Sequence, residues 1–120
     1  MRTVHDQRKH LEAGIFRMRI DAAFFDSKRA GMDLEEALRE AVGAGVLTLL
    51  SNRGAELRGL RDKELRETAW KRIQPGVAAI AQVTNLSQQR RHVVAVVTRC
   101  LTDIAFEFWD VHRESAATIG

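Results

Sequence analysis

The chain has 120 residues, 45% of them hydrophobic and 29% charged, a composition that favours one folded domain over a disordered chain. Its longest apolar runs are far too short to span a bilayer, so we expect no membrane contact and a cytoplasmic location. The only cysteine, Cys100, excludes an internal disulfide, and the formal net charge of +3 leaves an acidic partner open.

The first predicted helix spans Val4 to Arg29 and carries apolar side chains on two opposite sides. At about 100° per residue, one stripe gathers Leu11, Ile15, Met18, Ala22 and Phe25, and we expect it to pack against the last helix. The opposite stripe consists of Phe16, Ile20 and Phe24. It needs a second cover, from the second helix or from another copy of the protein. In so short a chain we expect another copy, and we assign these three residues to an oligomer interface.

The second predicted helix begins after Asp33, where Glu36 three residues later completes a capping-box pattern. It is apolar nearly all round from Val42 to Leu50, so we expect this half to lie deep in the core. Gly43 and Gly45 each weaken a helix by roughly 1 kcal/mol relative to alanine. We therefore expect them to allow another helix to approach closely.

The third predicted helix covers about Ala55 to Ile73, with a break near Gly59-Leu60 and Asp62 as the cap of the remainder. It ends at Gln74-Pro75-Gly76, because proline cannot continue the helical hydrogen bonds. A short apolar helix of one or two turns is expected over Val77 to Val83.

The last predicted helix runs from about Leu86 to Arg113, with Asn85 or Ser87 as a candidate cap. Its apolar residues recur at intervals of seven, then four and three: Leu86, Val93, Val97, Leu101, Ile104, Phe108 and Val111. This seam predicts a long partner helix, and only the first helix has a similar length. We therefore predict an all-α fold: a single-domain bundle of four to five helices over residues 1–120, with long first and last helices. Residues 115–120 should form a frayed tail.

No motif in the chain fixes a chemistry. His5 and His10 cannot both bind one metal from a single helical face, and the sequence contains no Glu-x-x-His pair for a di-iron site. Cys100 adjoins the apolar seam, where a cysteine is more often a buried hydrophobic residue than a nucleophile. We expect no metal, no cofactor and no catalytic residue, and we interpret the protein as not being an enzyme.

The tightest cationic cluster lies opposite the apolar seam, close to no acidic residue, and consists of Arg90, Arg91 and His92. We predict that this trio contacts a phosphate or an acidic partner. The function we favour is that of a non-enzymatic interaction or regulatory protein that forms a homo-oligomer, most simply a homodimer. The alternative is a small basic helical subunit that binds nucleic-acid backbone within a larger complex.

Overall fold

The computed structural model describes the backbone of residues 4–53 and 61–119, and the side chains of residues 14–51 and 61–107. Its elements are α1 (Val4–Arg29), α2 (Leu34–Arg53), α3 (Asp62–Ile73), the 3₁₀ turn η1 (Gln74–Gly76), α4 (Val77–Ala81) and α5 (Leu86–Ile119). No strand occurs in the described backbone, which confirms the all-α prediction. The first and last helices are the longest, with 26 and 34 residues.

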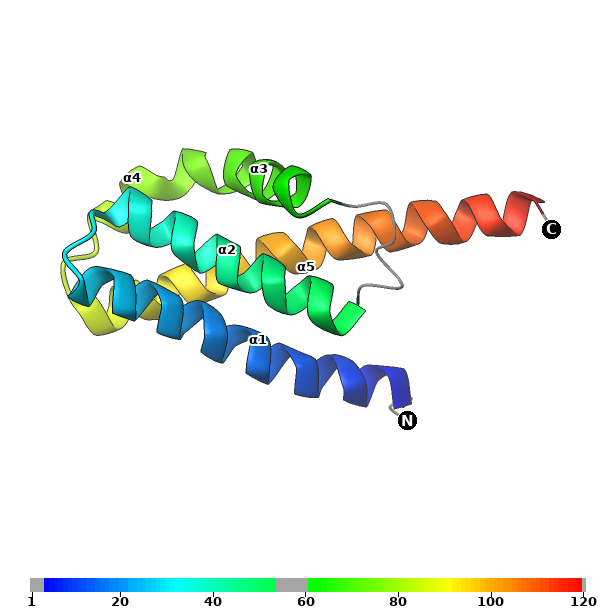
Figure 1. Ribbon diagram of the computed structural model, residues 1–120, viewed down its shortest axis with the longest axis horizontal. Helices are drawn as coiled ribbons and strands as arrows, with labels where there is room; N and C mark the ends of the chain where they lie inside the picture. Colours follow the sequence, from blue (N-terminus) through cyan, green and yellow to red (C-terminus); the bar gives the residue numbers. More distant parts are fainter. Residues whose placement is uncertain (1–3, 54–60, 120) are drawn as a thin grey trace.

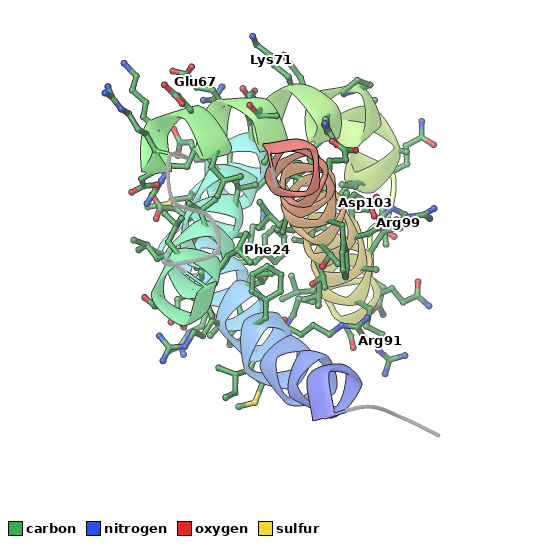
Figure 2. The ribbon with its side chains drawn as sticks, turned by 90° about the vertical axis from the view of Figure 1, so that its right-hand side faces the viewer. Phe24, Glu67, Lys71, Arg91, Arg99 and Asp103 are labelled. Carbon is green, nitrogen blue, oxygen red and sulfur yellow. The ribbon has the colours of Figure 1, made fainter. Side chains whose placement is uncertain are left out.

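The helices lie in three layers, with α2 and α5 in the middle, α1 on one side and α3 with α4 on the other (Figure 1, Figure 2). In this arrangement α1 and α3 run in one direction while α2 and α5 run in the other. At 1.5 Å per residue, α5 is about 51 Å long. It therefore accounts for the 52 Å long axis of the molecule, and its C-terminal end extends past the other helices (Figure 1).

A glycine ends α1. Gly31 has a φ of 89°, in the left-handed region that glycine adopts without a steric penalty. Its N–H donates to the carbonyl of Lys28, and the N–H of Met32 donates to the carbonyl of Ser27, both at 3.1 Å. This pair of hydrogen bonds is the Schellman motif, which satisfies carbonyls at the end of a helix and turns the chain toward α2.

Two polar side chains cap the N-termini of α2 and α5. The Asp33 carboxylate accepts a hydrogen bond from the backbone N–H of Glu36 at 2.8 Å, which confirms the predicted cap of α2. The Asn85 side chain accepts one from the N–H of Gln88 at 3.0 Å and caps α5. The buried amide of Gln89 donates to the carbonyls at the end of α4 and in the following turn, and so fixes that turn against α5.

The start of α3 differs from the prediction. The N-cap residue is Arg61, without a side-chain cap, and Asp62 is the first helical residue. The Asp62 carboxylate instead accepts hydrogen bonds from Arg66, one turn later, so it stabilises the helix as an ion pair. The predicted helical stretch from Ala55 to Leu60 lies outside the described residues. After Ile73 the chain passes through η1 directly into α4, so the proline interrupts the α-helix without reversing the chain.

The core forms where α2 approaches both α1 and α5. A Cβ atom at Gly45 would lie 2.6 Å from Leu101 Cδ1 and 3.3 Å from Ile20 Cδ1, so any larger residue would force these buried side chains to shift, and the helices approach closely here as the sequence suggested. The predicted seam of α5 is buried over Val93, Val97, Leu101 and Ile104. At its start Leu86 is exposed, and the side chains of Phe108 and Val111 lie outside the described ones. The helix continues to Ile119, six residues beyond its predicted end near Arg113.

The burial of the two α1 stripes differs from the prediction. Phe16 is 7% exposed and Ile20 and Phe24 are 0% exposed, all within a single chain, and Figure 2 shows Phe24 between the helices. Their assignment to an oligomer interface is therefore corrected: α2 and α5 cover them. Ile15 and Met18, expected to pack on the last helix, are 51% and 72% exposed.

Candidate interaction surface

The outward side of α1 carries Met18, the large apolar side chain with the highest exposed fraction among the described residues. We call Ile15, Met18, Ala22 and Phe25 the α1 outer face; Ala22 is exposed and Phe25 partly buried. At about 100° per residue these four positions fall within one stripe opposite the buried stripe. Leu11 would extend the stripe, but its side chain lies outside the described ones. The solvent-facing side of an amphipathic helix is normally polar, so an apolar solvent-facing side such as the α1 outer face is unusual.

An ion pair with α5 marks one end of the α1 outer face. The Asp21 carboxylate accepts hydrogen bonds from Nε and Nη2 of Arg90 at 2.9 and 2.8 Å. The Arg90 guanidinium carbon also lies 4.2 Å from the centroid of the Phe25 ring, while that of Arg29 lies 5.7 Å away. The hydrogen bond to Asp21 raises the pKa of Arg90 above its ordinary value. Phe25 is therefore held in place by two cations.

A groove of about 530 Å³ runs along the α5 side of this face. From α1 it is lined by Arg17, Met18 and Asp21, and from α5 by Ser87, Arg90, Arg91, Val94 and Ala95. Its apolar lining residues are Met18, Val94 and Ala95, and the side chains of Arg17 and Arg91 are exposed. Such a groove beside an exposed apolar stripe can receive side chains of a docked helix.

The structure divides the predicted cationic trio. Arg90 is bound to Asp21, whereas Arg91 and His92 are exposed on α5, and Figure 2 shows Arg91 on the outside of the molecule. The expectation that no acid lies near the trio is wrong, because Asp21 comes from a helix 69 positions earlier in the chain. Local sequence carries no signal of a pair at that separation.

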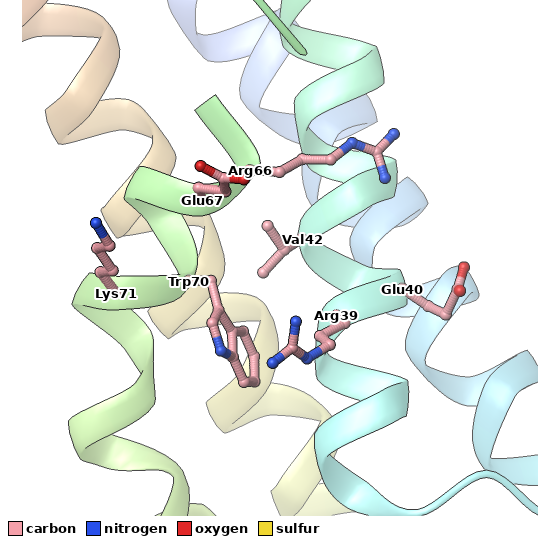
Figure 3. A pocket seen from close by; sticks show the side chains of 7 residues that line it. All are labelled: Arg39, Glu40, Val42, Arg66, Glu67, Trp70 and Lys71. Atoms are coloured by element: carbon pink, nitrogen blue, oxygen red, sulfur yellow. The ribbon is translucent and has the colours of Figure 1, made fainter. Parts of the chain in front are cut away.

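A second hollow, of about 340 Å³, lies between α2 and α3. The Arg39 guanidinium carbon lies 4.3 Å from the centroid of the Trp70 ring, and Arg39 also donates to Glu35 at 3.3 Å. Figure 3 shows that Glu40 and Lys71 point away from the hollow. Arg39 is thus engaged by Glu35 and Trp70, Arg66 is engaged by Asp62, and Glu40 and Lys71 are directed outward, so these groups do not converge on a common point.

The described side chains provide little for catalysis. Cys100 is partly buried, its Sγ donates to the carbonyl of Ala69 at 3.7 Å, and burial raises the pKa of the thiol. Among the residues described, no group of three or more His, Cys, Asp and Glu side chains is placed to hold a metal ion. His5, His10 and His112 lie outside the described side chains. No helix of the described part is long and apolar enough to cross a membrane.

The contacts and exposures of the chain itself therefore define its candidate site, the α1 outer face with the adjoining groove. The sequence indicates both apolar stripes of α1, but it does not show that the stripe with Phe16, Ile20 and Phe24 is the buried one. Comparison with protein-family models, with curated proteins and with solved structures gives no match.

Proposed function

We propose that the protein is a non-enzymatic helical interaction protein that forms a homodimer through the α1 outer face. The observation that carries this proposal is the exposure of Ile15 and Met18, one turn apart on a helix whose opposite side is buried. A monomer gains nothing by presenting such a stripe to water, whereas a docked partner would remove it from water.

The composition of the surface supports a protein partner. Protein interfaces are enriched in methionine, aromatic residues and arginine, with an apolar centre and a polar rim. The α1 outer face contains Met18 and Phe25, and Arg17 and Arg19 lie beside it. The core stripe of α1 is already covered within the chain, so the proposed partner would bind a folded surface and would not be needed to complete the core.

The alternative is binding to nucleic-acid backbone, and of the predicted trio only Arg91 and His92 remain for it, because Arg90 is engaged by Asp21. A gel shift with single- and double-stranded nucleic acid at low salt tests it, and we expect no retarded complex. Retardation that falls steeply with salt and is lost in Arg91→Glu would favour the alternative over a purely protein-binding role.

Light scattering on matched variants tests the homodimer. Met18→Asp places a charge at the centre of the α1 outer face, and we expect a folded monomer because an unpaired charge is costly to bury. Leu47→Asp is the control: Leu47 is 54% exposed but lies on α2, so this variant should remain a dimer like the wild type. A monomeric wild type at high micromolar concentration, or dissociation by Leu47→Asp and not by Met18→Asp, would overturn the proposal.

A further inference from the structure

We infer that the two copies pair antiparallel along α1, with Met18 against the partner's Ala22 and Ile15 against the partner's Phe25. The inference rests on the proposed homodimer and adds its geometry. Three properties of the α1 outer face support it: the spacing of its residues, their sizes and the charges beside them.

The spacing of the α1 outer face reads the same in both directions. Its four positions are separated by three, four and three residues, so a helix turned end over end presents the same pattern. An antiparallel partner aligned about position 20 therefore matches every position of the stripe with another position of the stripe. Because each contact then occurs twice, the pair has the two-fold symmetry common to homodimers.

The sizes of the side chains favour the antiparallel pair over the parallel one. Met18 projects furthest into solvent, while Ala22, one turn later on the same stripe, is small. An antiparallel pair places each methionine opposite an alanine, which lets two helices approach to the usual distance of about 8–10 Å. A parallel pair in register places methionine against methionine and alanine against alanine, and the helices would be held apart at one layer and leave a gap at the next.

The charged residues on the flank of α1 that faces away from α5 also favour the antiparallel pair. Arg19 and Asp26 are exposed there, and neither forms an ion pair with another described side chain. Side chains of a helix lean toward its N-terminus, so in an antiparallel pair Arg19 and the partner's Asp26 lean toward each other, twice by symmetry. In a parallel pair Arg19 lies opposite the partner's Gly14, and Asp26 lies opposite the partner's Asp21.

The other flank is compatible with this arrangement because of the ion pair within each chain. The antiparallel pair brings Asp21 near the partner's Asp21, and two unpaired carboxylates at this point would repel each other. Arg90 donates two hydrogen bonds to Asp21 in each copy, so each carboxylate is already neutralised by its own chain.

Disulfide trapping distinguishes the two orientations. Met18→Cys and Ala22→Cys are each introduced with Cys100→Ser, and the two proteins carry tags of different mass. They are oxidised separately and as a mixture, and the products are separated by non-reducing electrophoresis. A disulfide needs Cα atoms within roughly 4.4–6.8 Å. We therefore expect the mixed disulfide, which joins the Met18→Cys protein to the Ala22→Cys protein, to be the main product of the mixture, with little disulfide in either protein alone.

The outcomes separate this inference from the proposed homodimer. Efficient disulfides in each protein alone, together with a dimeric wild type, would show a parallel pair on the same face and overturn the inference alone. A dimeric wild type in which no combination forms a disulfide would place the interface elsewhere and overturn the inference as well. A monomeric wild type in light scattering would overturn both the inference and the proposed function.

A charge exchange provides a second test that needs no cysteine. Arg19→Asp should weaken the dimer about tenfold, because each of two attractive pairs becomes repulsive. The double variant Arg19→Asp with Asp26→Arg should restore wild-type affinity in an antiparallel pair, as measured by analytical ultracentrifugation at low salt. Failure of the second substitution to rescue the first would overturn the orientation.

Discussion

The Arg90 guanidinium and the Asp21 carboxylate form a two-hydrogen-bond ion pair that joins the two longest helices, with distances of 2.9 and 2.8 Å. The same guanidinium carbon lies 4.2 Å from the centroid of the Phe25 ring. Arginine is well suited to this double contact, because its flat fork can donate to a carboxylate while its face lies on an aromatic ring. One side chain thus orients α5 against α1 and fixes one end of the α1 outer face.

This contact predicts different results for two adjacent arginines. Arg90→Ala should lower the midpoint of urea unfolding, because it removes the ion pair and the contact with Phe25. Arg91→Ala should leave the midpoint nearly unchanged, because Arg91 is exposed. A double-mutant cycle of Arg90→Ala with Asp21→Ala should show coupling between the two positions. Equal effects of the two arginine variants would contradict a structural role for Arg90.

The two glycines of α2 predict opposite effects of the same substitution. A Cβ atom at Gly45 would meet the buried side chains of Leu101 and Ile20, so Gly45→Ala should cost about 1–3 kcal/mol through overpacking. A Cβ atom at Gly43 would lie 2.5 Å from Nη1 of Arg66, a partly exposed side chain that is able to move away. Gly43→Ala should therefore stabilise the protein by up to about 1 kcal/mol, through the higher helix propensity of alanine. Urea unfolding measures both, and a Gly45→Ala protein as stable as Gly43→Ala would refute the close approach of the helices.

The burial of one α1 stripe and the exposure of the other predict different effects of a charged residue on the two sides of the helix. Ile20 is completely buried, so Ile20→Asp should unfold the chain and abolish the helical signal in circular dichroism. Met18→Asp, two residues earlier, should keep that signal. A folded, monomeric Ile20→Asp protein would show instead that the Phe16, Ile20 and Phe24 stripe is the interface, as the sequence alone suggested.

Local features of the sequence predicted much of the fold. The bounds of α1, the Asp33 cap and the burial of Leu101 and Ile104 follow from spacing and residue type within one or two helical turns. Gly45 was expected to permit a close approach, because a glycine weakens a helix and needs a packing reason to remain in its apolar half.

Other features depend on contacts between distant segments and could not be predicted in this way. A helical wheel gives the angle between two stripes of α1, but it does not show which stripe faces the core when both are apolar. Here Phe16, Ile20 and Phe24 face inward, where α2 and α5 cover them. The same limit applies to Arg90, whose partner Asp21 is 69 residues away.

The ion pair between Arg72 and Glu107 predicts a dependence on pH. Arg72 Nη1 and Nη2 donate to the Glu107 carboxylate at 3.0 and 2.6 Å, and these hydrogen bonds lower the pKa of Glu107 below its ordinary value of 4.5. A carboxyl group with a lowered pKa stabilises the folded state above its ordinary pKa, and this contribution is lost as the pH falls through the lowered value. NMR titration should show the pKa of Glu107 returning toward 4.5 in Arg72→Gln. An unchanged value would mean that the pair is not formed in solution.

The central claim, that the outer face of α1 is covered by a second copy, is tested most directly by the oxidation of methionines in the unaltered protein. Met18 and Met32 are both exposed in the single chain, and only Met18 lies on the α1 outer face. Their oxidation by hydrogen peroxide is followed by peptide mass spectrometry at low and at high protein concentration, with peroxide in excess over methionine. We predict that the oxidation of Met18 slows as the dimer forms, while that of Met32 keeps the same rate. Equal oxidation of Met18 at both concentrations, in a protein that light scattering shows to be dimeric at the higher one, would contradict the account.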